Sequence, residues 1–128
     1  MRLLLDTHCT VWAFMDTKRL SKVARDAIQD PASTVYVSVG SVWEIAIKVG
    51  IGKWPQAQAV LLDFEAHMLR ANFLMLPIQL SHARAAGLIV ATHRDPFDRL
   101  LAAQAVAEGL ILVTSDPQMP SLGAQVIW

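Results

Sequence analysis

Short apolar runs alternate with segments of helical periodicity along the whole chain, and this alternation constrains the fold more than any other feature. We predict strands at residues 2–6, 34–39, 74–77, 110–114 and 125–128. The first and fourth are continuous apolar runs, which is typical of strands buried on both faces of a parallel sheet. Because helical segments separate the strands, we expect an α/β fold with a central, mainly parallel sheet flanked by helices.

Helical segments are predicted at residues 11–15, 22–29, 41–49, 57–71, 82–89 and 96–108. Ser21 and Ser81 are placed to cap the second and fifth of them, and Asp95 to cap the last. Pro96 at the first position of the last helix and Gly109 just past its end fit the usual helix preferences. No linker, repeat or low-complexity tract interrupts the chain, so we expect residues 1–128 to form a single domain.

The composition is apolar and electrically balanced. Hydrophobic residues make up 54% of the chain and the mean hydropathy is +0.39, so we expect an exposed apolar face and a protein partner. Basic and acidic residues number 11 each, which argues against a generally basic coat for nucleic acid. Any polyanion must therefore be held locally.

Cys9 is the only cysteine, so no intramolecular disulfide can form, and its apolar neighbours favour a buried, inert thiol over a nucleophile. The apolar run at the N-terminus ends at Asp6 and is too short for the core of a signal peptide. No stretch approaches the roughly 20 apolar residues of a membrane span. We therefore expect a cytoplasmic location.

Four carboxylates lie where an apolar stretch meets a turn or a helix: Asp6, Glu44, Asp98 and Asp116. Asp6 and Asp116 follow predicted strands, and parallel sheets bind ligands outside the carboxyl ends of their strands. If the four carboxylates meet there, they need a counter-charge, because like charges raise one another's pKa. All-oxygen ligands favour Mg²⁺ or Mn²⁺ over Zn²⁺, and no Cys/His spacing typical of zinc sites occurs. We therefore predict a site for a divalent metal.

Each acid also has a purely structural alternative. Asp6 can cap the helix that follows it, and Asp116 can form a turn. Glu44 has capping-box spacing from Ser41 and lies four residues before Lys48, a favourable helical pair.

Asp98 has the same ambiguity, because it occupies the third position of the helix that Asp95 caps, where negative charge suits the helix dipole. The metal hypothesis therefore depends on convergence of these side chains in space. The histidines are scattered along the chain and are interpreted as surface or packing residues: His8, His67, His82 and His93.

A carboxylate-held metal suits phosphoryl chemistry, because it lowers the pKa of bound water and stabilises charge on the leaving oxygen. The chain has no glycine-rich phosphate loop or Walker lysine motif, so hydrolysis of nucleoside triphosphates is not supported. A phosphodiester is the better substrate. With the four carboxylates neutralised by metal, the remaining charges leave a surplus of four positive ones and permit a modest positive rim.

Four ordered segments carry a resemblance to a known family: LLLDTH at 3–8, SVGSVWEIAIK at 38–48, HRDPFDRLLAAQA at 93–105 and LVTSD at 112–116. They resemble the motifs of PIN-domain ribonucleases, in particular the VapC-type toxins of prokaryotic type II toxin–antitoxin pairs. The resemblance implies a PIN-like three-layer α/β/α fold and an endoribonuclease that needs Mg²⁺ or Mn²⁺. It also implies a homodimer and a cognate antitoxin that blocks the site.

Carried over by position, the resemblance implies that Asp6 and Asp98 are the principal metal ligands. Glu44 would be a ligand or would position water, and Asp116 would be a further ligand. The loop at 117–123 departs from the family pattern, which often has an aromatic residue before the last strand. Supporting contacts are implied for the neighbours of these acids: Thr7, Ser115 and Asp95.

Candidate contacts to RNA phosphates are Lys48, Arg94 and Arg99, because they lie close in sequence to the proposed acids. Lys48 can instead pair with Glu44, and Arg99 with Asp95.

Three tryptophans are candidates for contacts with a ligand or a partner. Trp43 is interpreted as a core residue because Val42 and Ile45 flank it. All three could stack on bases or line a groove for a partner, and Trp12 and Trp54 are the better candidates for an interface.

Two other classes of function remain open. A receiver-type phosphoacceptor domain is also a small parallel α/β domain with an acidic Mg²⁺ site, but it needs adjacent acids after the first strand and a late lysine. Here Thr7 follows Asp6, and no lysine occurs after Lys53. The third reading is a non-catalytic binding module whose acids are only caps, and such a module should bind no Mg²⁺.

Overall fold

The sheet has five strands, and every neighbouring pair of them is parallel. The computed structural model describes residues 1–128. Its strands are β1 (Arg2–Leu5), β2 (Thr34–Ser38), β3 (Leu74–Leu76), β4 (Ile111–Val113) and β5 (Val126–Ile127). Their order is β3-β2-β1-β4-β5. The predicted α/β class with a central parallel sheet is confirmed.

β1 lies in the middle of the sheet and pairs with β2 on one side and β4 on the other. The chain thus builds the sheet outward through β2 and β3, then returns to the opposite side of β1 with β4 and β5. Such a reversal separates the loops that leave neighbouring strands and opens a crevice at their carboxyl ends. Asp6 and Asp116 lie at this edge, just beyond β1 and β4.

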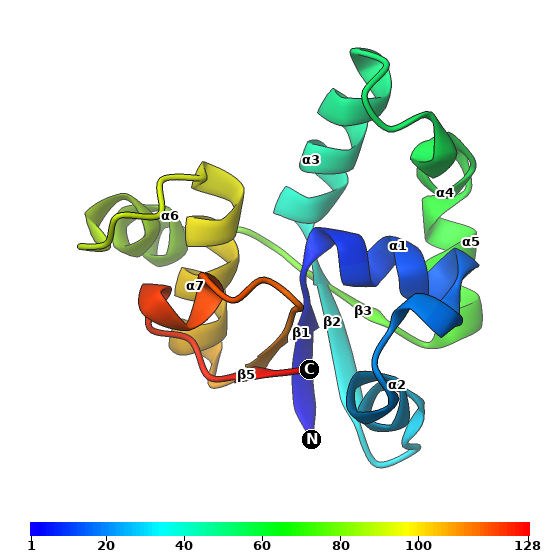
Figure 1. Ribbon diagram of the computed structural model, residues 1–128, viewed down its shortest axis with the longest axis horizontal. Coiled ribbons are helices and arrows are strands. Elements are labelled where there is room, and N and C mark those ends of the chain that lie inside the picture. Colours follow the sequence, from blue (N-terminus) through cyan, green and yellow to red (C-terminus); the bar gives the residue numbers. More distant parts are fainter.

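Helices cover both faces of the sheet, as Figure 1 shows. One face carries α1 (Thr7–Met15), α2 (Lys22–Gln29), α4 (Gln58–Leu62) and α5 (Phe64–Ala71). The other carries α6 (Leu80–Leu88) and α7 (Pro96–Glu108), while α3 (Val39–Gly50) contacts both α1 and α7. Short 3-10 turns complete the chain: η1 (Thr17–Arg19), η2 (Pro55–Ala57) and η3 (Met119–Leu122). The expected three-layer α/β/α arrangement is confirmed.

Alternate residues of β1 supply the two cores. Leu3 and Leu5 pack with Val37 under the helices of one face, whereas Leu4 packs with Leu112 under the other. All five side chains have no solvent exposure. A strand buried on both faces needs apolar residues at every position, which explains why the run at 2–6 does not alternate.

Two predicted helix starts are wrong because a residue earlier in the chain caps the helix. The helix predicted from Ser41 begins at Val39, because Ser38, the last residue of β2, accepts a 3.0 Å hydrogen bond from the amide of Gly40. Ser41 is therefore inside the helix, and its capping box with Glu44 does not form. Likewise, Gln79 rather than Ser81 caps α6.

Other boundaries also differ from the predictions. The helix predicted at 57–71 breaks at Asp63, whose backbone leaves the helical region between α4 and α5. The helix predicted from residue 11 starts at Thr7, directly after β1. The caps Ser21 and Asp95 are confirmed, as is the end of the last helix before Gly109, which adopts a left-handed conformation. No helix combines the length and hydrophobicity that a membrane crossing requires.

Trp43 is not a core residue, because 61% of its surface is exposed on α3. Its ring contacts the edge of Phe97 at 5.2 Å between centroids. The prediction failed because Trp43 projects from the outer side of α3, whereas Ile45 of the same helix is completely buried.

Cys9 is fully buried in the core, and this burial raises the pKa of its thiol far above the ordinary range. We therefore expect the folded protein to react with a thiol reagent at least about 100-fold more slowly than the urea-unfolded protein. Timed alkylation followed by mass spectrometry measures both rates. Equal rates would show that the thiol is accessible in the folded state.

Candidate metal centre

Asp6 stands at the junction of β1 and α1. Its amide donates a 3.0 Å hydrogen bond to the carbonyl of Val113, which extends the pairing of β1 and β4 by one residue. Its Oδ1 accepts a 2.8 Å hydrogen bond from the amide of Cys9 and so caps α1. The cap is real, but it uses one carboxylate oxygen and leaves the second for another contact.

Glu44 is buried and held from two sides. The hydroxyl of Thr7 donates to its Oε1 at 2.5 Å, and Lys48 donates to its Oε2 at 2.7 Å. The Oγ atom of Ser41 lies 3.2 Å from the same Thr7 hydroxyl. The predicted pair of Glu44 with Lys48 is thus present, and it supplies the positive charge that a buried carboxylate needs.

Asp98 lies in the first turn of α7, and Asp95 caps that helix. Oδ1 of Asp95 accepts hydrogen bonds from the amides of Phe97 and Asp98, at 2.9 and 3.1 Å. The carboxylate of Asp98 faces His93 instead, whose Nε2 lies 2.7 Å from its Oδ2. Burial raises the pKa of Asp98, and the hydrogen bond to Asp98 raises the pKa of His93.

Asp116 forms a turn, and its carboxylate also lies near that of Asp98 and near the imidazole of His93. Its Oδ1 accepts a 2.8 Å hydrogen bond from the amide of Gln118, and its own amide donates to Thr114 Oγ1 at 3.1 Å. The loop that departs from the family pattern continues into η3, where Met119 is 1% exposed. This buried side chain anchors the loop behind Asp116.

The side chains of these elements line one cavity of about 360 Å³, which we call the acidic pocket. It contains the four predicted acids and the three predicted supporting residues, together with Lys48 and two ring-bearing residues of α1. Its lining is Asp6, Thr7, His8, Trp12, Glu44, Lys48, Asp95, Asp98, Ser115 and Asp116. The convergence on which the metal hypothesis depended is therefore present.

The donor set of the acidic pocket fits a divalent metal. Ligand atoms of Asp98, Asp116 and His93 lie within 4.8 Å of one another, close enough for one ion to contact all three. Asp6 and Glu44 lie outside this three-residue cluster but line the same cavity. The carboxylate oxygens of this set suit Mg²⁺ and Mn²⁺.

His93 was missed from the sequence as a member of this cluster. It lies in the loop between α6 and α7, where no helical or strand period shows which side chains face the pocket. The only available signal was its position five residues before Asp98 within the matched motif.

Two predicted phosphate contacts do not line the acidic pocket. Arg94 and Arg99 border a separate shallow hollow beside the loop after α6. The Arg99 guanidinium donates to four main-chain carbonyls, and no ion pair with Asp95 forms. These acceptors belong to Ala86, Ile89, Ala91 and His93.

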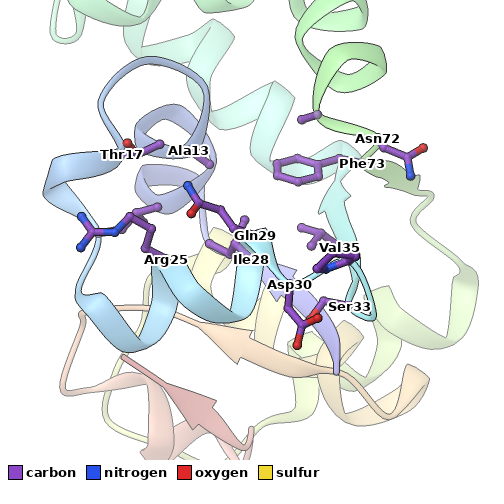
Figure 2. A pocket seen from close by; sticks show the side chains of 13 residues that line it. Ala13, Thr17, Arg25, Ile28, Gln29, Asp30, Ser33, Val35, Asn72 and Phe73 are labelled. Atoms are coloured by element: carbon purple, nitrogen blue, oxygen red, sulfur yellow. The ribbon is translucent and has the colours of Figure 1, made fainter.

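Another hollow, at the opposite edge of the sheet, has different chemistry. Figure 2 shows Arg25 and Gln29 of α2 on one side of it and Phe73 on the other, near the amino ends of β2 and β3. Its volume is about 370 Å³, but its only carboxylate is Asp30. Because Asp30 Oδ1 accepts a hydrogen bond from the amide of Ala32, this acid serves a turn. The hollow therefore does not offer a metal site.

The model of the PIN domain family matches residues 3–124. The chain belongs to the PIN domain family. The predicted resemblance is thereby confirmed, and it covers the segments that contribute every residue of the acidic pocket. Comparison with curated protein sequences gives no significant match.

Solved structures with the same fold include complexes from three bacteria. FitAcB from Neisseria gonorrhoeae is 21% identical with a TM-score of 0.67, covering 98% of this chain and 96% of that one. VapBC-1 from nontypeable Haemophilus influenzae is 17% identical with a TM-score of 0.66, covering 99% and 97%. VapBC2 from Rickettsia felis, bound to a DNA fragment from its promoter, is 19% identical with a TM-score of 0.61, covering 99% and 98%.

Proposed function

We propose that this PIN domain is a metal-dependent endoribonuclease and the toxin of a toxin–antitoxin pair. The observation that carries the proposal is the convergence of Asp6, Glu44, Asp98 and Asp116 in one cavity at the carboxyl edge of a parallel sheet. Lys48 neutralises only Glu44, so the other three acids around the same opening repel one another unless a further cation binds. The family match and the VapBC and FitAcB neighbours support the same function.

In this proposal, Asp6, Asp98 and Asp116 would hold Mg²⁺ or Mn²⁺, and the bound ion would activate water for attack and stabilise charge on the leaving oxygen of the phosphodiester. The Nε2–H of His93 donates to Asp98 and fixes the direction of that carboxylate. Glu44 contacts the metal or orients water, and its bonds to Thr7 and Lys48 keep it in place.

We also propose a homodimer and a cognate antitoxin as protein partners. An exposed apolar groove of about 510 Å³ supports the expected protein contact. It runs along α3 and α5 and is lined by Val39, Val42, Leu61, Phe64, Glu65, Met68, Leu69, Phe73 and Met75. The single domain, the cytoplasmic location and the RNA target remain predictions.

Cleavage of RNA should require added metal. With total cellular RNA as substrate, we expect excess EDTA to lower the cleavage rate by about 100-fold or more, and Mg²⁺ or Mn²⁺ in excess of the EDTA to restore it. Sequencing of fragment ends reports the cleavage sites. Cleavage that persists in excess EDTA would refute metal dependence, and acyl-phosphate labelling of an aspartate would favour the receiver-type alternative.

A further inference from the structure

Four ring-bearing residues from separate parts of the chain form a continuous row beside the acidic pocket. His8 lies 4.6 Å from Trp54 and 5.8 Å from Trp12, measured between ring centroids. Trp12 in turn lies 6.1 Å from Trp128. Because α1, the segment before η2 and the residue after β5 all contribute, tertiary structure rather than local sequence assembles this aromatic row.

The aromatic row joins the acidic pocket to a second cavity. This cavity has a volume of about 440 Å³, larger than a single nucleobase, and includes Trp12 and Trp54. Trp12 lines both cavities, and His8 lines the acidic pocket. The remaining walls of the second cavity are Val11, Met15, Asp16, Arg19 and Gln56. A chain with a phosphate in the acidic pocket can therefore place a neighbouring base against Trp12.

Two cations flank the rings. Lys48 Nζ lies 5.8 Å from the ring centroid of Trp54, and the Arg19 guanidinium lies 6.0 Å from that of Trp12. Arg19 is largely exposed, and its contact with Asp16, at 3.6 Å, is a loose surface pair. Of these two cations, Arg19 is exposed, whereas Lys48 is half-buried and paired with Glu44. Aromatic faces beside cations are the usual surface for single-stranded nucleic acid.

Packing alone does not account for the row. Trp12 and Trp54 touch the core, but both keep part of their surface in solvent, and His8 and Trp128 are exposed. The groove on α3 and α5 fits a protein partner better than the aromatic row does, because eight of its nine lining residues are hydrophobic. The second cavity is more polar, with four hydrophobic residues of seven.

We propose that Trp12, Trp54 and His8 form a stacking subsite for one unpaired nucleobase of the RNA, next to the phosphodiester that is cleaved. This inference rests on the proposed nuclease function. A base within a duplex is already stacked on both sides and cannot enter such a subsite without unpairing.

Binding of a short unstructured RNA in EDTA tests the subsite without cleavage. Tryptophan fluorescence should be quenched on binding, and Trp12→Ala should weaken binding by roughly 5- to 150-fold, as should Trp54→Ala. Trp12→Phe retains a ring and should bind nearly as well as the natural protein. Trp43→Ala, which removes an exposed tryptophan elsewhere, is the matched control and should leave affinity unchanged.

A scan of single abasic residues through the same RNA makes the test specific to stacking. At one position the abasic RNA should bind the natural protein as weakly as intact RNA binds Trp12→Ala, and combining both changes should cost little more. Circular dichroism of each variant checks the fold.

Several outcomes would overturn the subsite. One is unchanged RNA binding by Trp12→Ala, and another is an equal loss of RNA affinity in Trp12→Ala and Trp43→Ala. A third is a loss of affinity at every abasic position that adds to the loss caused by Trp12→Ala. Loss of dimerisation in sedimentation, with RNA affinity intact, would identify the row as a protein interface instead. If the natural protein cleaves RNA and the tryptophan variants bind RNA normally, only the subsite is refuted. A natural protein that neither binds nor cleaves RNA refutes the proposed function.

Discussion

Asp98→Asn is expected to lower RNA cleavage by at least about 10³-fold, equal to roughly 4 kcal/mol of transition-state stabilisation. Asparagine keeps the size of the side chain and can still accept the hydrogen bond from His93, so the fold should survive. It removes the negative charge that a divalent cation requires. Asp6→Asn should act in the same way, and calorimetric titration with Mn²⁺ should show weakened binding for both variants.

Asp95→Asn is the matched control for Asp98→Asn. It lies three residues away, lines the same pocket and loses the same charge, but its observed contacts are those of a helix cap. Because asparagine caps helices as well as aspartate does, cleavage should change by less than about 10-fold. Cleavage retained in both Asp6→Asn and Asp98→Asn would disprove the metal assignment. Equal losses in Asp95→Asn and Asp98→Asn would show that Asp95 is a functional acid as well.

Arg99→Ala is expected to lower the free energy of unfolding by about 2–4 kcal/mol, because it removes a charged donor from several main-chain carbonyls at once. Arg99→Lys should recover only part of this loss, since an ammonium group cannot span the acceptors that the guanidinium fork reaches. Urea unfolding followed by circular dichroism measures both variants.

The same variant separates two roles for Arg99. If Arg99 supports the loop, unfolding will change in the absence of RNA, and the salt dependence of RNA binding will keep its slope. If Arg99 neutralises a phosphate, stability will stay unchanged and the slope will fall by about one. The second result would show that Arg99 contacts an RNA phosphate, as the sequence suggested, and would contradict its role in supporting the loop.

Strands were easier to predict than the starts of helices. Residues 3–5 of β1 are buried on both faces of the sheet and must all be apolar, and that run is visible in the sequence. The start of α3 was not visible in this way, because Ser38 is both the last residue of a strand and the cap of the next helix. Where two elements share a residue, no turn residues mark the boundary.

Most of the acidic pocket was predictable because of a rule of topology. Asp6 and Asp116 follow adjacent parallel strands, so their positions at one edge depend only on the order of the strands. Asp98 and Glu44 required the family resemblance as well, since each has an adequate local role. The imidazole of His93 was not predictable, because an irregular loop has no period from which its direction can be read.

The sequence by itself determined the parallel α/β fold, the family and the acids at the ends of the strands, because apolar periodicity and sequence motifs depend only on residues near one another in the chain. Tertiary structure alone decided which side chains became partners. It directed Arg99 of α7 to main-chain carbonyls of α6 and the loop after it, placed His93 on Asp98, and brought Trp12 and Trp54 to one cavity. Each of these contacts depends on distances between segments that are set only when the helices pack on the sheet.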